Sequence, residues 1–285
     1  MSLNTQGAEW TEVIEASPGA LQVNLGQLWR YRDLIAMLVR RDFVANYKQT
    51  VLGPLWFVLQ PAMTSLTYVV IFGRAAGLAP GKVPMLLFYL SGVTVWNYFA
   101  DCLTKTATVF KDNASMFGKV YFPRLVMPFT IVISNLMKFC VQLCLFVLAW
   151  LYYLVLGRVA LPGLLLLLVP VLVLLLGLMG LGAGMIVSAL TTKYRDLIFL
   201  ISFGVQLLMF TTPVIFPMER IPEHYRWMVR ANPLSPIVEA FRQAFAVGGS
   251  ISWGGLAYGA AWALVLVVVG VVIFNRVERS FTDTV

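Results

Sequence analysis

The sequence predicts an all-α integral membrane protein with six transmembrane helices. Of its 285 residues, 60% are hydrophobic and only 12% are charged, whereas about a quarter of the residues in a typical soluble domain are charged. A soluble fold of this size has too little interior to bury so much apolar surface, so lipid must solvate part of it. Six apolar stretches approach the roughly 20 residues that a helix needs to cross a bilayer. They lie at 52–73, 84–104, 129–156, 164–190, 197–216 and 254–274.

Two segments precede these spans. Residues 1–27 are polar and lack the basic start and apolar core of a signal peptide, so we expect none. Residues 28–50 contain apolar side chains at helical spacing, with Arg40, Arg41 and other charged residues largely on the remaining face. This pattern predicts an amphipathic helix lying on the cytoplasmic leaflet. A soluble helix that packs against a partner is the alternative. Residues 51–285 then form the transmembrane domain.

The distribution of Lys and Arg between the spans predicts the orientation. With the N-terminus in the cytoplasm, thirteen basic residues fall on the cytoplasmic side and seven on the outer side. Cytoplasmic loops are enriched in Lys and Arg, so both termini are predicted to be cytoplasmic. Because the basic residues are spread between the spans in this way, the net charge of +8 does not indicate nucleic-acid binding.

The third span carries three polar residues on one helical face. Asn135, Lys138 and Gln142 follow the spacing i, i+3, i+7. A charge within the membrane normally faces protein or water, so these residues are candidates for a substrate path. A Lys side chain that reaches the interface, beside two helix–helix hydrogen bonds, explains them equally well. We expect no acidic residue deep in a span, since Asp101 lies near an end, and this disfavours a proton- or sodium-coupled carrier.

Aromatic residues crowd the first two spans. Tyr89, Trp96 and Phe99 are candidates for contact with carbohydrate, because aromatic faces stack on sugar C–H bonds. Position alone favours belts of aromatic residues at the membrane interfaces. In the fourth span, Gly180 and Gly184 form a small-xxx-small pair, which predicts close helix packing rather than a hinge.

A polar stretch between the fifth and sixth spans contains two short helical patterns punctuated by prolines. Asn232 or Ser235 is suited to start the second pattern, which is apolar on one face. Helices too short to span would dip into the outer leaflet, as a lid over a path or as a structural cap. The predicted outer gate comprises Pro213, Pro217, Pro233, Glu239 and Arg242.

The segment "LTTKYRDLIF" (190–199) interrupts two apolar runs with four polar residues. It must be a tight turn at the bilayer surface, since backbone without partners is not tolerated in lipid. We expect Asp196 to cap the fifth span and Lys193 and Arg195 to anchor the cytoplasmic side. Tyr194 and Arg195 also suit a protruding contact with a partner's groove.

Several kinds of site are not expected. Cys102, Cys140 and Cys144 have no metal-ligand spacing and are interpreted as small hydrophobic residues, and His224 as solvated surface. No metal site or cofactor is predicted. The sequence also contains no phosphate loop of the G-x-x-x-x-G-K-[ST] kind, so ATP is not bound by that device.

Five short motifs resemble those of ABC-2 type polysaccharide-export permeases, with the O-antigen branch most similar and teichoic acid and capsule exporters as close relatives. The first begins at Arg41-Asp42-Phe43, continues through Tyr47-Lys48-Gln49-Thr50 and ends in "LGPLWFVLQP" (52–61). The others are "YFPRLVMP" (121–128), "KYRDL" (193–197), "TPVIFP" (212–217) and "NPLSPIVEAFR" (232–242). They occur in family order and cover residues 28 to about 275.

This resemblance implies six spans, an interface helix that includes Tyr47 and Lys48, and two short re-entrant helices at the outer end. It implies a homodimer that docks two copies of a separate ATPase subunit, which binds the ATP and Mg. The segments near 111–124 and 191–196 would couple to that ATPase. The coupling candidates are Lys119, Tyr121, Arg124, Lys193, Tyr194, Arg195 and Asp196.

The resemblance implies a subunit without enzymatic activity, in a bacterial inner membrane. It would move undecaprenyl-pyrophosphate-linked polysaccharide to the outer leaflet. An ABC-2 permease for a smaller lipid or drug is the alternative. A membrane-embedded glycosyl- or phosphotransferase is a third possibility, but the 13 acidic residues are scattered rather than clustered at a membrane face.

Overall fold

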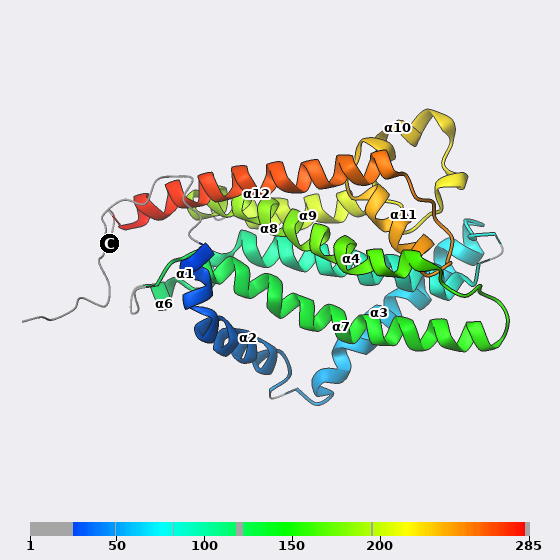
Figure 1. Ribbon diagram of the computed structural model, residues 1–285, viewed down its shortest axis with the longest axis horizontal. Coiled ribbons are helices and arrows are strands. Elements are labelled where there is room, and N and C mark those ends of the chain that lie inside the picture. The colour runs from blue at the N-terminus through cyan, green and yellow to red at the C-terminus, as the bar shows by residue number, and fades with distance from the viewer. Residues whose placement is uncertain (1–24, 49, 82, 118–121, 195, 283–285) are drawn as a thin grey trace, which may run out of the picture.

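The computed structural model describes residues 25–48, 50–81, 83–117, 122–194 and 196–282. Within these ranges every regular element is a helix. The helices form an elongated bundle whose long members run along a common axis (Figure 1). The predicted polar segment 1–27 lies almost entirely outside the described residues.

The elements follow one another along the chain with short connections. The α-helices are α1 (Leu25–Arg30), α2 (Arg32–Tyr47), α3 (Trp56–Tyr68), α4 (Met85–Ala107), α5 (Val109–Asp112), α6 (Ala114–Phe117), α7 (Val126–Val155), α8 (Val169–Lys193), α9 (Leu197–Phe210), α10 (Glu223–Ala231), α11 (Ser235–Ala244) and α12 (Trp253–Thr282). Short helices of other types are η1 (Gly53–Leu55), η2 (Val69–Ala75), η3 (Leu164–Leu168) and η4 (Met218–Arg220).

Among the residues that the structure describes, four helical segments are long and apolar enough to cross a membrane. They are Gly53–Ala75, Val126–Val155, Leu164–Thr192 and Trp253–Val277. Each coincides with a predicted span, which confirms a multi-pass, all-helical membrane protein. The first of them is composite, because η1 leads into α3 and the π-helix η2 continues it.

The other two predicted spans also form helices, but one is not apolar enough and the other is not long enough to be counted with these four. Helix α4 has 23 residues, but Asn97, Asp101 and Lys105 lower its mean hydropathy. Helix α9 has only 14 residues, which corresponds to about 21 Å at 1.5 Å per residue, less than the roughly 30 Å of a hydrocarbon core. The predicted fifth span, 197–216, is therefore shorter as a helix, because the chain turns after Phe210.

Glycines let α8 pack closely against helices on two sides. A Cβ at Gly184 would lie 2.5 Å from the Thr106 Cβ of α4, and one at Gly180 would lie 2.7 Å from the Cys102 Cβ. On the side of α12, a Cβ at Gly270 would lie 2.7 Å from the Gly182 carbonyl oxygen. The prediction that Gly180 and Gly184 serve helix packing is confirmed.

The amphipathic helix packs against its own chain. Leu38 and Val39 of α2 are 1% and 7% exposed, and Leu38 belongs to a cluster that includes Val126 of α7 and Phe274 of α12. Much of the apolar face predicted for 28–50 is therefore covered by protein. The exposed Trp29, in α1, could still contact lipid, and location at the membrane surface stays a prediction.

The two ends of the bundle differ. Helices α1 and α6 and the last turns of α12 gather at one end (Figure 1). Helices α10 and α11 and the loop after α7 gather at the opposite end. This arrangement places the predicted coupling segment near 111–124 and the predicted outer gate at opposite ends.

Candidate functional site

Helix α11 begins at a turn that the Asn232 side chain holds. Its Oδ1 accepts a hydrogen bond from the Leu234 amide at 3.0 Å, and its Nδ2 donates to Thr212 Oγ1 at 2.8 Å. The helix starts at Ser235, and Pro236 occupies its first turn, where proline needs no amide partner. Asn232 was one of two predicted starting residues, and it also ties α11 to the turn after α9.

Arg242 links several segments at the end of the bundle where α10 and α11 lie. Its side chain is 0% exposed. The guanidinium donates to the carbonyl oxygens of Pro213 and, at 2.9 Å, Val214, and to Ser91 Oγ of α4 at 3.4 Å. It also lies over the Phe88 ring, with Cζ 3.7 Å from the ring centroid. One side chain therefore joins α11, α4 and the turn after α9.

Glu239 is the charge partner of Arg242. Its Oε1 lies 3.6 Å from Arg242 Nη1, one helical turn away. Burial lowers the pKa of Arg242 to about 10 and raises the pKa of Glu239. Arg242 is thus still charged at neutral pH, and the pair compensates two charges that would be costly to bury alone.

The structure brings the predicted outer-gate residues to one end of the bundle. Arg242 contacts both Pro213 and Glu239, as described above. Pro217 lines a cavity together with Glu239. The Pro233 carbonyl oxygen faces α12, where a Cβ at Gly259 would lie 3.0 Å from it. Whether these residues gate a path stays a prediction.

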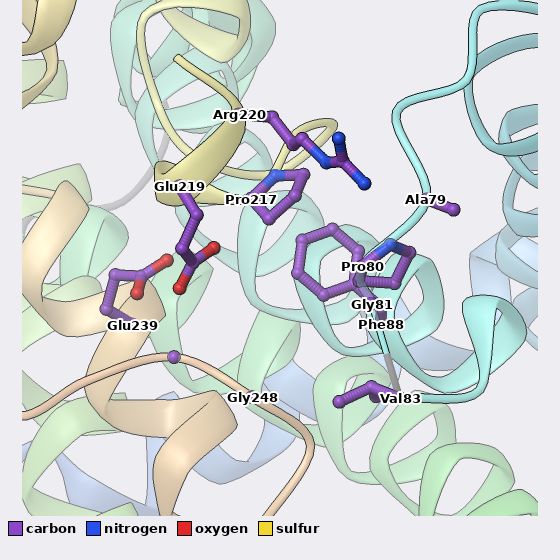
Figure 2. Close-up of a pocket in the computed structure, with 11 residues that line it drawn as sticks. Ala79, Pro80, Gly81, Val83, Phe88, Pro217, Glu219, Arg220, Glu239 and Gly248 are labelled. Carbon is purple, nitrogen blue, oxygen red and sulfur yellow. The ribbon is translucent and has the colours of Figure 1, made fainter. Parts of the chain in front are cut away.

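The cavity has a volume of about 490 Å³. The carboxylates of Glu239 and Glu219 lie on one side of it, and the rings of Pro217, Phe88 and Pro80 form the wall across from them (Figure 2). Gly248 and Gly249 close another side, and both have positive φ, of 87° and 83°. The turn after α11 depends on this conformation, because a Cβ at Gly249 would lie 2.4 Å from the Glu239 carbonyl oxygen.

A ladder of polar side chains joins α4 and α7 inside the bundle. Lys138 Nζ donates to Asp101 Oδ2 at 2.7 Å, forming an ion pair. The other rungs are Lys105 Nζ to Asn135 Oδ1, at 3.1 Å, and Asn97 Nδ2 to Gln142 Oε1, at 3.5 Å. Helices α4 and α7 are antiparallel. Residues 97, 101 and 105 of α4 therefore face residues 142, 138 and 135 of α7, which the sequence places on one helical face.

This ladder favours the helix–helix interpretation of the third span's polar face. Asn135 and Gln142 are 2% and 3% exposed, and Lys138 has an acidic partner within the chain. The expectation that no acid lies deep in a span stays a prediction: α4 continues to Ala107, and Asp101 lies about 9 Å before its end. The sequence held a signal for this arrangement in the spacing of residues 97, 101 and 105.

The three aromatic candidates lie in the hydrophobic core. Tyr89, Trp96 and Phe99 are 0%, 7% and 4% exposed and belong to one cluster of buried residues. Trp96 packs on Phe99 with ring centroids 5.6 Å apart. Neither the open path nor the interface belt that we weighed describes this position. The rings are buried because α4 is enclosed by neighbouring helices, and contact with sugar stays a prediction for another conformation.

The coupling candidates at the inner end are described only in part. Lys119, Tyr121 and Arg195 lie outside the described residues, as does the side chain of Lys193. Arg124 is half-buried just before α7, and Tyr194 is 51% exposed. A role in coupling stays a prediction for all of them.

Asp196 precedes α9, as predicted, but it does not cap the helix in the expected way. Its side chain is exposed and forms no capping hydrogen bond, and its own backbone already has helical angles (φ −69°, ψ −23°). A capping side chain needs an extended backbone at this position to reach the free amides. Its charge still lies near the positive end of the α9 dipole.

The basic residues predicted for the interface helix are solvent-accessible, both in α2 and at Lys48, which follows it. Arg40, Arg41 and Lys48 are exposed, whereas the side chain of Tyr47 lies outside the described residues. Arg41 pairs with Asp42 at 2.8 Å and also reaches Met116 Sδ in α6 at 3.8 Å. In the described parts of the chain, no group of three or more His, Cys, Asp or Glu residues could hold a metal ion.

Comparison with known proteins gives relatives that extend over nearly the whole chain. It is 28% identical over 265 residues to the "O-antigen export system permease protein RfbA" of Klebsiella pneumoniae, covering 92% of this chain and 98% of that protein. It is 29% identical to the protein of the same name from Myxococcus xanthus, covering 77% and 82%. It is 25% identical to the "Polysialic acid transport protein KpsM" of Escherichia coli, covering 86% and 94%.

The family assignment is independent of these individual relatives. The model of the ABC-2 type transporter family matches residues 33–246, which extend from α2 to the turn after α11. The matched range therefore includes the polar ladder, the Arg242 contacts and most of the long helices. The chain belongs to the ABC-2 type transporter family.

Proposed function

We propose that this chain is the membrane-spanning subunit of an ATP-driven exporter that moves lipid-linked, O-antigen-like polysaccharide across a bacterial inner membrane. The observation that carries this proposal is the similarity to O-antigen export permeases, which extends over 92% of this chain and 98% of the Klebsiella protein. A match over both full lengths supports the same type of subunit. The undecaprenyl-pyrophosphate anchor of the cargo is part of the proposal.

Two copies of the chain form the channel, and two copies of a separate ATPase subunit dock beneath it. Exposed apolar faces support a homodimer: Phe199 and Phe203 of α9 are 80% and 59% exposed, and Met63 of α3 is 55% exposed. A second copy and lipid would share these faces. The exposed Tyr194 and the neighbouring Arg195 contact the ATPase, which supplies the phosphate loop that this sequence lacks.

All six long helical segments cross the membrane, and both termini are cytoplasmic. The pairing of Asp101 with Lys138 supports α4 as a span, because an ion pair within the bundle costs less than two separate charges in lipid. Helix α9 crosses with the help of the turn residues up to Phe216. The short helices α10 and α11 re-enter from the outer side, where the amphipathic pattern of α11 buries its inner face.

Removal of the gene in a bacterium that displays the polysaccharide tests this function. We expect the polymer to disappear from the cell surface and to accumulate inside on its lipid carrier, and plasmid-borne protein to restore display. An enzyme of polymer synthesis would instead leave no polymer to accumulate. Polymer that still reaches the surface, or that is never made, contradicts the proposal, and the second result favours a transferase.

A further inference from the structure

The cavity at the outer end has the size of a small-molecule site. Its volume of about 490 Å³ lies within the range of roughly 300–1,000 Å³ typical of ligand pockets. It is built by segments far apart in sequence: the loop before α4, helix η4, α11 and the turn after α11. Arg242 joins α11 to α4, which contributes Phe88 to the lining, and to the turn after α9 that leads to Pro217, so these contacts fix part of the cavity wall.

The walls of the cavity combine apolar rings with carboxylates. The rings of Phe88, Pro80 and Pro217 offer apolar surface, while the Glu239 and Glu219 carboxylates offer hydrogen-bond acceptors on the other side (Figure 2). Glu239 is 6% exposed, so its carboxylate sits within the wall, whereas Glu219 is exposed at the rim. An ionised carboxylate accepts hydrogen bonds and donates none.

A sugar ring matches this combination. Its hydroxyl groups donate to carboxylates, and its C–H faces pack on apolar rings. Arg220, also on the lining, adds donors at the rim for the sugar's acceptor oxygens. A purely apolar ligand would displace water from the Glu219 carboxylate without replacing its hydrogen bonds, which carries a desolvation cost, whereas Glu239 keeps Arg242 as its partner.

We propose that this cavity binds one or two sugar units of the exported polymer, and that Glu219 and Glu239 select neutral or amino sugars over acidic ones. This inference rests on the proposed polysaccharide cargo. The selection follows from like charges, because an acidic sugar would bring a further carboxylate beside those of Glu219 and Glu239.

Binding of matched trisaccharides to the purified full-length chain in lipid nanodiscs tests the site. The probes are maltotriose, triacetylchitotriose and trigalacturonic acid, and the measurement is saturation-transfer NMR. We expect signals from the first two sugars and at least tenfold weaker signals from trigalacturonic acid. Equal or stronger binding of trigalacturonic acid contradicts the selection, and absence of binding by both neutral sugars contradicts the site.

Three variants locate the binding. Val83→Trp fills the cavity from its lining and is expected to reduce the maltotriose signal at least fivefold. Glu219→Gln keeps the side-chain size and is expected to raise trigalacturonic acid binding. Glu223→Gln changes an exposed acid on α10 that does not line the cavity and should alter neither. Wild-type maltotriose binding by a folded Val83→Trp protein places the sugar elsewhere and overturns the proposal.

Display of polysaccharide by cells carrying the same variants separates this inference from the proposed function. If the wild-type chain does not support display, the proposed function fails whatever the nanodiscs bind. If it does support display and Val83→Trp both binds sugar and exports normally, only the cavity site fails. The melting temperature of each variant shows whether it is folded.

Discussion

At the residue scale, the buried Arg242 and the partly buried Lys138 both find charge partners within the chain. Arg242 has hydrogen bonds on three sides and Glu239 within 3.6 Å, and Lys138 has Asp101 within 2.7 Å. The sequence analysis placed Glu239 and Arg242 in the outer gate and Lys138 on a candidate substrate path, but it did not identify the residues that they contact. The hydrogen-bond partners of Arg242 described above lie 28 to 151 residues away in sequence, and the spacing of residues in one sequence carries no information on contacts between distant segments.

Replacement of Arg242 should destabilise the outer end strongly. Arg242→Gln removes the cation beside Glu239 and leaves several buried carbonyl groups without a donor. Breaking a buried charge pair by removing one partner costs about 3–5 kcal/mol, so we expect a clearly lower melting temperature in detergent. The matched control is Arg230→Gln, which removes an exposed Arg of α10 and should change the melting temperature little. Equal effects of the two substitutions would show that the Arg242 contacts do not stabilise the fold.

The ion pair between α4 and α7 can be tested by exchanging its charges. Asp101→Lys alone places two cations together and should reduce folded protein in the membrane. Adding Lys138→Asp restores an opposite-charge pair, so the double variant should recover much of the yield and melting temperature. If the double variant is no better than the worse single variant, the 2.7 Å contact is not what requires these residues.

At the element scale, α8 is the central helix because its glycines allow backbones on two sides to approach. The motif "GLMGLGAG" predicted this packing from sequence alone, since small residues four apart are a local signal. The ends of α4 and α9 were less predictable. Polar residues such as Asp101 made α4 appear shorter. Pro213 is a local signal that α9 ends near Phe210, but the apolar run that continues to Phe216 concealed it.

A pair of glycine substitutions tests the packing of α8. A Cβ at Gly184 would lie 2.5 Å from Thr106 Cβ, whereas a Cβ at Gly204 in α9 would meet nothing within 4 Å. Overpacking of a tight interface costs roughly 1–3 kcal/mol. We therefore expect Gly184→Ala to lower the melting temperature and Gly204→Ala to leave it unchanged or raise it slightly. The reverse order would contradict the close approach of α4 and α8.

At the scale of the whole molecule, the two ends of the bundle are predicted to lie on opposite sides of the membrane. Fold class, the long helices and the order of the motifs were accessible from the sequence, because composition and apolar stretches are properties of the chain itself. The cavity was not, because four separate segments build it. The burial of Tyr89, Trp96 and Phe99 was missed for a related reason, since no local pattern distinguishes a core aromatic from one at an interface.

Labelling of single cysteines tests this topology. In a background without Cys102, Cys140 and Cys144, a membrane-impermeant thiol reagent added outside should reach cysteines placed near Glu223 and Arg158. Cysteines near Asn113 and Arg276 should react only after the membrane is opened. Labelling near Asn113 in intact cells would overturn the orientation that the distribution of Lys and Arg predicts.

Reconstituted transport tests the central claim most directly. The chain is purified with its ATPase subunit and placed in proteoliposomes that carry lipid-linked polysaccharide on the leaflet facing the ATPase, and the fraction of polymer that an added glycosidase can digest is measured over time. We predict that ATP makes the polymer inaccessible to the glycosidase, and that omission of the permease or of ATP abolishes this protection. Polymer that stays equally digestible with and without ATP would contradict the account.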